Sequence, residues 1–212
     1  MQVSDIKESR DWITQQKFSA SRHNWLEDAQ GEHSSVAAFS ELSLKLSQLG
    51  CPPELLAGTH QAALDEIRHA QIAFTLDAAN GSAKGPAEER GLFGKAGHLF
   101  RIHKMAAETF ADGCLNEALS AQELKTRAQE EPDAVIKQEL DQIAREEDTH
   151  VDLSWKIVKW CFGELQDARL RARLFRHLSS TLAATEARSG GRDGAIFEKA
   201  RESLNTIYAP AI

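Results

Sequence analysis

Six residues of this chain have the types and the spacing of a metal site. Two Glu-x-x-His pairs stand far apart in the sequence, and a single glutamate precedes each of them. In chain order the set is Glu32, Glu66, His69, Glu117, Glu147 and His150. Carboxylate oxygens and imidazole nitrogens are the ligands expected for iron or manganese. The Glu-x-x-His pairs alone are a weak signal, because short motifs of common residues recur by chance.

Long helices must position these residues, because strand signals are scarce and residues that favour helices fill long stretches. Proline and glycine divide these stretches. We expect helices over about 21–49, 53–79, 98–130 and 132–162, then an arginine-rich fifth helix over about 166–186. The first 20 or so residues form an N-terminal extension, with Trp12 and Phe18 as anchors of a short helix. The predicted fold class is all-α.

Each of the four long helices has an apolar stripe at helical spacing, and a glutamate interrupts each stripe near its middle. In the first helix, for example, Ala29 and Phe39 flank Glu32 on this stripe. A buried carboxylate without a partner costs several kcal/mol. Four of them in one core therefore indicate that a cationic group, such as a pair of metal ions, compensates their charge.

The glutamates and histidines also lie at matched depths. Glu32 and the Glu66–His69 pair are equally far from Gly50, and Glu117 and the second pair are equally far from Pro132. Residues equidistant from the turn of an antiparallel hairpin lie at one level, so both hairpins bring their ligands together. Residues 81–97 can extend about 55 Å, which exceeds the length of about 40 Å expected for the second helix. This segment can therefore cross the bundle and make the second and third helices parallel.

This order of residues on four helices resembles the ferritin-like di-iron carboxylate superfamily, which includes bacterioferritins, rubrerythrins and di-iron oxygenases. The resemblance covers residues 21–162, between the extension 1–20 and a C-terminal helical extension, 163–212. It implies an antiparallel four-helix bundle with a long crossover between helices two and three, plus an extra C-terminal helix. It also implies two iron ions as the cofactor, although manganese or a mixed pair stays open.

The resemblance further implies individual roles. Glu66 and Glu147 would bridge the metals, Glu32 and Glu117 would be terminal ligands, and each histidine would bind one metal. Residues preceding each Glu-x-x-His pair would orient the histidine of the opposite pair. Three core residues of the first and third helices are expected to line a pocket, and one acidic residue is an alternative ligand. The orienting residues are Asp65 and Glu146, the pocket residues are Phe39, Phe110 and Cys114, and the alternative ligand is Asp112.

Three functions fit such a site. The first is an O₂-activating oxygenase, hydroxylase or oxidase that acts on a small organic molecule or a modified nucleoside, with an electron donor protein as a partner. The second is iron or peroxide handling of the ferroxidase or peroxidase type. The third is a non-enzymatic, metal-stabilised helical module. A rubredoxin-type module is not expected, because the three cysteines form no Cys-x-x-Cys pair.

Composition restricts the partners and the location. The net charge of −7 disfavours nucleic acid, and tRNA stays open only because of the basic patch of Arg169, Arg171, Arg173 and Arg176. No apolar run approaches the roughly 20 residues of a membrane span, and the N-terminus lacks an apolar signal core, so we expect a cytoplasmic protein. The residues beyond a minimal bundle could build a substrate entrance or a homodimer contact.

Overall fold

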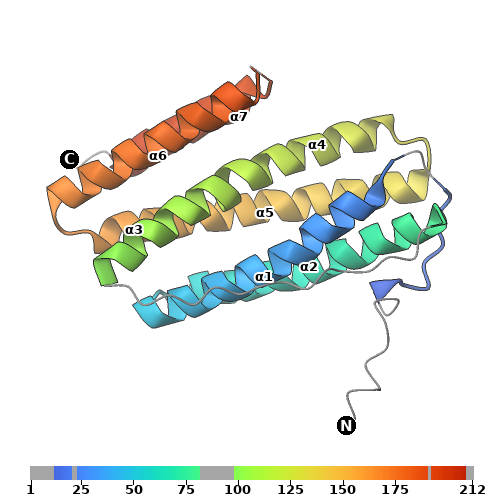
Figure 1. The fold of residues 1–212 in the computed structure, drawn as a ribbon, viewed down its shortest axis with the longest axis horizontal. Helices are drawn as coiled ribbons and strands as arrows, with labels where there is room; N and C mark the ends of the chain where they lie inside the picture. The colour runs from blue at the N-terminus through green and yellow to red at the C-terminus, as the bar shows by residue number, and fades with distance from the viewer. Residues whose placement is uncertain (1–11, 21–22, 82–97, 191, 209–212) are drawn as a thin grey trace, which may run out of the picture.

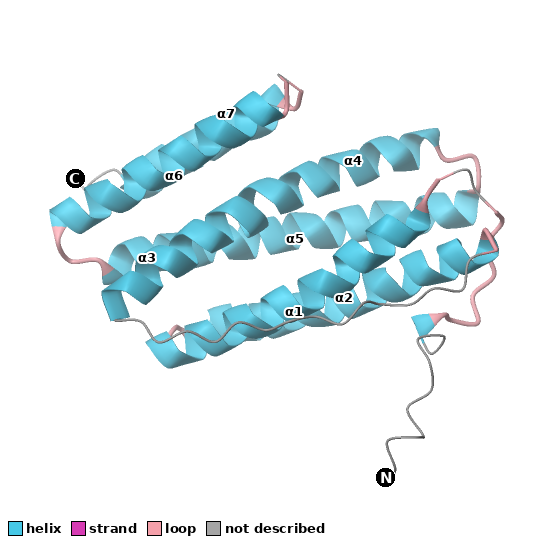
Figure 2. Ribbon diagram, in the orientation of Figure 1, coloured by secondary structure: helices cyan, strands magenta, loops and turns pink. Residues whose placement is uncertain are grey.

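The computed structural model describes residues 12–20, 23–81, 98–190 and 192–208, and none of these lies in a strand. Figure 2 shows helices joined by short loops. In chain order the helices are α1 (Trp25–Leu49), α2 (Pro53–Ala79), α3 (His98–Thr109), the π-helix η3 (Phe110–Asn116), α4 (Glu117–Glu130), α5 (Ala134–Glu164), α6 (Ala168–Arg188) and α7 (Gly194–Tyr208). The fold class is all-α, as predicted.

The helix ends follow local chemistry. Gly50 adopts a left-handed conformation, φ 69°, and its N–H donates to carbonyls of the last turn of α1. Asp133 caps α5 by accepting hydrogen bonds from the N–H groups of Val135 and Ile136. Asp167 caps α6 in the same way. These signals explain why the predicted breaks lie within a few residues of the observed ones.

The long helices lie side by side (Figure 1). α1 packs along α2, and α4 packs along α5, each pair being joined by a short turn. α2 ends at the opposite end of the molecule from the start of α3 (Figure 1), so these two helices run in the same direction. α6 and α7 pack on each other and contact the π-helix. The predicted crossing segment falls almost wholly on residues 82–97, which lie outside the described residues.

The helices differ from the prediction in three respects. The first helix begins at Trp25 rather than near residue 21, since His23 and Asn24 are not helical. The predicted third helix contains the seven-residue π-helix in its middle. The C-terminal region has two helices rather than one, because α7 follows a turn at Gly190, where φ is 65°. Phe197, Ala200 and Leu204 are the buried residues of α7, spaced for one helical face.

The described part of the N-terminal extension, residues 12–20, is not the predicted short helix but a largely extended segment. Trp12 does act as an anchor, because its ring meets those of His33 and Phe74 edge-on at centroid distances of 4.9 and 6.2 Å. Phe18 packs against a second cluster of the core. His33, which directly follows Glu32 in α1, is half-buried beneath Trp12.

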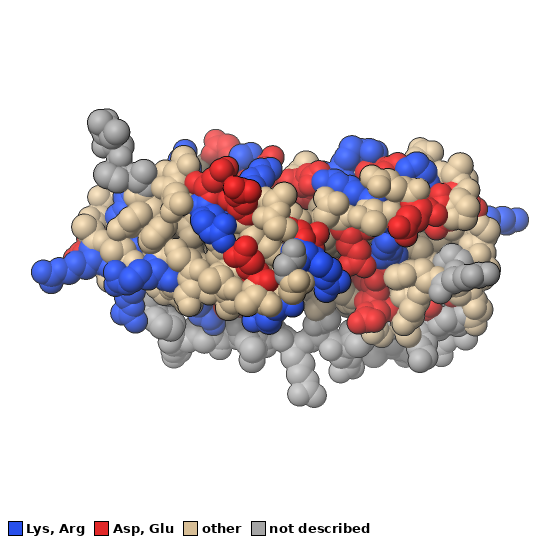
Figure 3. Space-filling view, turned by 90° about the horizontal axis from the view of Figure 1, so that it is seen from above, with Lys and Arg blue, Asp and Glu red and all other residues tan. Residues whose placement is uncertain are grey.

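Charges of both signs cover the surface. Figure 3 shows acidic and basic side chains interspersed over the face formed by α4, α6 and α7. Arg169, Arg173 and Arg176 of the predicted basic patch are exposed on α6, and Arg171 is half-buried. Within the part of the chain that the structure describes, no helix combines the length and apolar character needed to cross a bilayer.

Candidate metal centre

All six residues singled out in the sequence meet in the interior, although they come from four helices. Their ligand atoms form two overlapping groups, within each of which all the atoms lie within 4.8 Å of one another. We call them the His69 group, formed by Glu32, Glu66, His69 and Glu147, and the His150 group, formed by Glu66, Glu117, Glu147 and His150. Each group could hold a metal ion. The alternative residue, Asp112, belongs to neither group.

The two imidazoles face the carboxylates with the same nitrogen, Nδ1. His69 Nδ1 lies 3.2 Å from Glu147 and 3.6 Å from both Glu66 and Glu32. His150 Nδ1 lies 3.1 Å from Glu66 and 3.4 Å from Glu147. Glu66 and Glu147 therefore stand between the two rings and belong to both groups.

Several of these atoms are enclosed without a hydrogen-bond partner. They are both carboxylate oxygens of Glu66, Oε2 of Glu147, and Nδ1 of His69 and of His150. Buried polar atoms in proteins nearly always have a partner, and leaving one unsatisfied costs roughly 1–3 kcal/mol. A cluster of five such atoms, all aimed at one another, is what a bound cation would satisfy. The donor set of carboxylate oxygens and imidazole nitrogens therefore fits a metal ion.

The outward nitrogens of the imidazoles have partners that fix the rings. His69 Nε2 lies 2.7 Å from Glu146, and His150 Nε2 lies 3.3 Å from Asp65. Each orienting acid thus faces the histidine of the opposite Glu-x-x-His pair, in the arrangement that the resemblance implied. A carboxylate behind a ligating histidine fixes the ring and its tautomer.

One supporting residue was missed from the sequence. Arg68 forms an ion pair with Glu146 and a second one with Glu139 at 3.2 Å. It therefore holds the carboxylate that in turn holds His69. Asp65 has a weaker support, a hydrogen bond of 2.9 Å from the Gln61 amide. An arginine directly before a predicted ligand was the available signal, but its helical position alone does not reveal its partners.

The electrostatics of the metal-free centre favour bound protons. Burial raises the pKa of Glu32 to about 8, against the opposing effect of His69. Burial and the neighbouring carboxylates also raise the pKa of Glu117 well above its ordinary value. Burial alone would lower the pKa of His150, but Glu147 and Glu66 outweigh it and raise this pKa to about 10. The pKa of His69 is raised for the same reason.

The π-helix places Glu117, which directly follows it. Gly113 of this segment packs so closely on α5 that a Cβ atom there would lie 2.0 Å from Oγ of Ser154. A π-helix is rare, and short π segments often occur at functional sites. The close approach at Gly113 brings the backbone of the third long helix against α5 one turn before Glu117.

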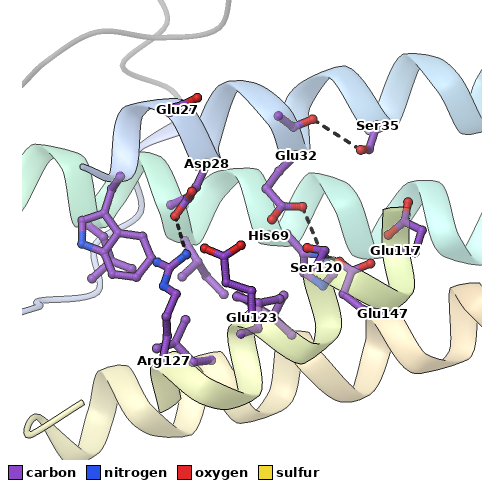
Figure 4. Close-up of a pocket in the computed structure, with 18 of the residues that line it drawn as sticks. Glu27, Asp28, Glu32, Ser35, His69, Glu117, Ser120, Glu123, Arg127 and Glu147 are labelled. Carbon is purple, nitrogen blue, oxygen red and sulfur yellow. Dashed lines mark hydrogen bonds and ion pairs between the residues drawn. The ribbon is translucent and has the colours of Figure 1, made fainter. Parts of the chain in front are cut away.

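Two cavities reach the centre. The first has a volume of about 330 Å³ and is lined by Glu32, His69, Glu117 and Glu147 together with polar residues at its mouth. Figure 4 shows Glu27, Asp28, Glu123 and Arg127 around this mouth, with Arg127 paired to Asp28 at 2.9 Å. It therefore offers a strongly acidic path from the surface to the candidate ligands.

The second cavity lies between α1 and the segment from α3 through the π-helix, and its volume is about 470 Å³. Phe39 and Met105 contribute apolar lining, and Glu117 and Ser154 lie at the end nearest the centre. Of the predicted pocket residues only Phe39 lines it. Phe110 and Cys114 are buried in the core and line neither cavity, because the wider π-helix changes which side chains face inward.

Comparison with family models, with curated proteins and with solved structures finds no match for this chain. The chemistry of the site must therefore be inferred from the residues and their geometry.

Proposed function

We propose that this chain is a di-iron oxidoreductase built on a ferritin-like four-helix bundle, and that it oxidises a small organic molecule with O₂. One observation carries the proposal. Two overlapping donor groups share Glu66 and Glu147, and five of their atoms, three from these shared carboxylates and Nδ1 of each histidine, are enclosed without hydrogen-bond partners. Manganese or a mixed metal pair offers the same ligand chemistry.

The topology supports this proposal. α1 and α2 form one hairpin and α4 and α5 form another, while α2 and α3 run in the same direction (Figure 1). Ferritin-like bundles have one such long connection, and they place a glutamate on two helices and Glu-x-x-His on the other two. The extra helices α6 and α7 lie outside this set and contribute no residue to the two donor groups.

The charge of the six residues also fits two divalent cations. With both imidazoles neutral, the four glutamates carry four negative charges, which two divalent ions would balance. Glu66 and Glu147 would be shared ligands, Glu32 and Glu117 would each complete one group, and each histidine would bind through Nδ1. Bound ferrous ions would supply the electrons for O₂ reduction. Glu146 and Asp65 would hold the imidazoles in the orientation that binding requires.

The second cavity supports an organic substrate. Its inner end is lined by Glu117 and Ser154, and its walls include Phe39 and Met105. A pocket of a few hundred Å³ with apolar walls and a few polar groups is typical of small-molecule sites. The volume of about 470 Å³ admits a small molecule beside the centre. Repeated turnover would also require an electron donor, since the ferrous state must be restored.

Iron handling of the ferroxidase or peroxidase type is a second candidate, favoured by the first cavity. Its mouth carries Glu27, Asp28 and Glu123, and Asp28 forms an ion pair with Arg127. Acidic side chains around a narrow opening raise the local concentration of cations. The same path would serve an oxygenase that only needs to be loaded with iron.

The test starts from metal-free protein. Ferrous iron is added without oxygen, unbound iron is removed by gel filtration, and iron is counted per chain. We expect about two irons per chain, and no uptake would refute the metal centre. O₂ consumption is then followed in excess ferrous iron. Consumption that stops after one reaction of the bound iron supports the oxygenase proposal, whereas sustained consumption with ferrous iron as the only reductant supports iron handling.

A further inference from the structure

A third cavity lies away from the metal centre, between α3 and α6. Its volume is about 720 Å³, and its lining residues are His103, Lys104, Ala107, Glu108, Leu170, Arg173 and His177. The cationic and titratable residues therefore come from both helices. The rings of His103 and His177 are stacked across the interface, with centroids 5.2 Å apart and an interplanar angle of 21°.

Three basic residues of this cavity, His103, Arg173 and His177, lack an anionic partner among the described residues. Among the described residues, no ion pair involves His103, Arg173 or His177, whereas Arg68, Arg127 and Arg201 each pair with a carboxylate. Glu108 is the one acidic residue of the lining, and it is engaged by Lys45 at 2.8 Å and by Lys104 at 3.4 Å. Burial, and then the positive charges of His177 and Arg173, lower the pKa of His103.

One nitrogen of the His103 ring, Nε2, is enclosed and has no hydrogen-bond partner. Two stacked imidazoles beside a guanidinium repel one another whenever they carry protons. A bound anion would remove this repulsion, and an arginine with a free planar face of N–H donors matches an oxyanion in geometry.

We propose that the cavity between α3 and α6 binds the oxyanion group, phosphate or carboxylate, of a small molecule, with Arg173, His177 and His103 as its binding residues. The cavity has room for more than a phosphate ion, and Leu170 and Ala107 offer apolar contacts to the remainder of a larger ligand. Arg173 thereby acquires a role that the basic patch noted in the sequence did not specify.

The site adjoins the second cavity, because Lys104 and Glu108 line both. An anion that attracts Lys104 would leave Glu108 to Lys45 alone. A ligand in the third cavity is therefore in a position to alter the charged rim of the second cavity. The binding proposal itself does not depend on the metal centre or on its activity.

Isothermal titration calorimetry of the full chain with inorganic phosphate, at constant ionic strength, tests the proposal. We expect saturable binding at one site and an Arg173→Gln variant that binds phosphate at least about tenfold more weakly, since a charge-assisted contact is lost. Arg176→Gln is the matched control, because Arg176 is exposed on the same helix but does not line the cavity. It should bind phosphate as the parent chain does.

Three further measurements separate the outcomes. Acetate replaces phosphate to distinguish a carboxylate ligand from a phosphate ligand, and saturable binding of either supports the site. Proton resonances of His103 and His177 should move on binding, and the pKa of His103 should rise because an anion favours the protonated ring. Equal weakening in the Arg173→Gln and Arg176→Gln variants would overturn the proposal. The proposal would also be overturned if Ni²⁺ shifted the proton resonances of the two histidines and phosphate did not.

Discussion

The two donor groups of the candidate centre share two glutamates but differ in what lies behind their histidines. Behind His69, Glu146 is held by Arg68, which also pairs with Glu139, and by the Gln142 amide at 3.0 Å. Behind His150, Asp65 has a longer contact and only an amide as its own partner. Among the described residues, a charged network therefore supports the acid behind His69, whereas a neutral amide supports the acid behind His150.

The groups also differ in what lies beside them. Glu32 comes from the regular helix α1 and lines the first cavity, whereas Glu117 directly follows the π-helix and lines both cavities. The His69 group is therefore more rigidly supported, and the His150 group lies next to the space that would hold a substrate. This difference suggests that the His69 group mainly retains its metal, while the His150 group must adjust as ligands enter the second cavity.

The largest expected effect is loss of both metals when a shared residue is changed. Glu147→Gln removes a negative charge and one ligand oxygen from both groups, so iron per chain should fall from about two to below about one. Iron is counted after anaerobic loading and gel filtration. Glu139→Gln is the control, since Glu139 contacts Arg68 and the Gln16 amide at the edge of the network and belongs to neither donor group, so this variant should leave two irons bound. Two irons in the Glu147→Gln variant would show that Glu147 is not shared.

Changing an unshared residue should remove one metal and leave the other. Glu32→Ala is expected to empty the His69 group, and Glu117→Ala the His150 group, each leaving about one iron per chain. Far-ultraviolet circular dichroism should stay helical in both variants. If Glu117→Ala retains two irons, Glu117 is not a ligand, and the proposed role of the π-helix in placing it would be lost.

A smaller effect should follow when the residues behind the histidines are changed. Glu146→Gln is expected to weaken metal binding by about 10–100-fold, as is usual for partners of ligating histidines. Asp65→Asn should weaken it less, because the Asp65 contact is longer and lacks an arginine. Competition with a chelator measures both dissociation constants. A stronger effect of Asp65→Asn would reverse the comparison between the two groups.

A substitution in the π-helix tests the packing beside the His150 group and leaves all six candidate ligands in place. Gly113→Ala places a methyl group 2.0 Å from Oγ and 2.7 Å from Cβ of Ser154, and overpacking of this kind costs about 1–3 kcal/mol. Chemical unfolding of the metal-free protein measures this loss. Addition of Ser154→Gly should recover part of it in a double-mutant cycle. If Gly113→Ala lowers the free energy of unfolding equally in the parent chain and in the Ser154→Gly variant, the contact with Ser154 does not cause the loss.

The sequence predicted the helices and the meeting of the six residues because both depend on local signals. Gly50, Pro132 and Asp133 end or begin helices by chemistry visible in the sequence, and equal distances from the turns bring Glu32 and Glu66 to one level. The π-helix was not predicted, and the close contact between its Gly113 and Ser154, about 40 residues away, leaves no local signal in the sequence. The network of Arg68 and the docking of Trp12 likewise depend on partners distant in the sequence.

The pH dependence of stability gives the smallest and most general prediction. In the folded, metal-free protein the pKa of Glu32 rises from 4.5 to about 8, and the pKa of His150 rises from 6.5 to about 10. Both residues therefore bind protons more tightly in the folded protein than in the unfolded chain. This stabilisation is complete at low pH and is lost as the pH rises through these raised values. Glu66 and Glu147 act in the opposite sense, because hydrogen bonds outweigh burial and lower their pKa values. The largest of these comes from His150 for Glu66 and from Glu117 for Glu147, and the histidines add further contributions. The contribution of these two glutamates to stability is lost as the pH falls below about 4.5.

Metal-free protein should therefore melt at a temperature at least about 5 °C lower at pH 9 than at pH 6.5, a change of one to two kcal/mol for a chain of this size. Metal-loaded protein should not show this loss, because metal binding releases the protons and becomes tighter as the pH rises. Differential scanning calorimetry with Zn²⁺, which avoids oxidation, compares the two forms. If the melting temperature falls equally between pH 6.5 and pH 9 in both forms, these six residues do not exchange protons for metal. If Glu32→Gln reduces this loss and Asp65→Asn does not, the part that is removed belongs to the carboxylates of the centre and not to those behind the histidines.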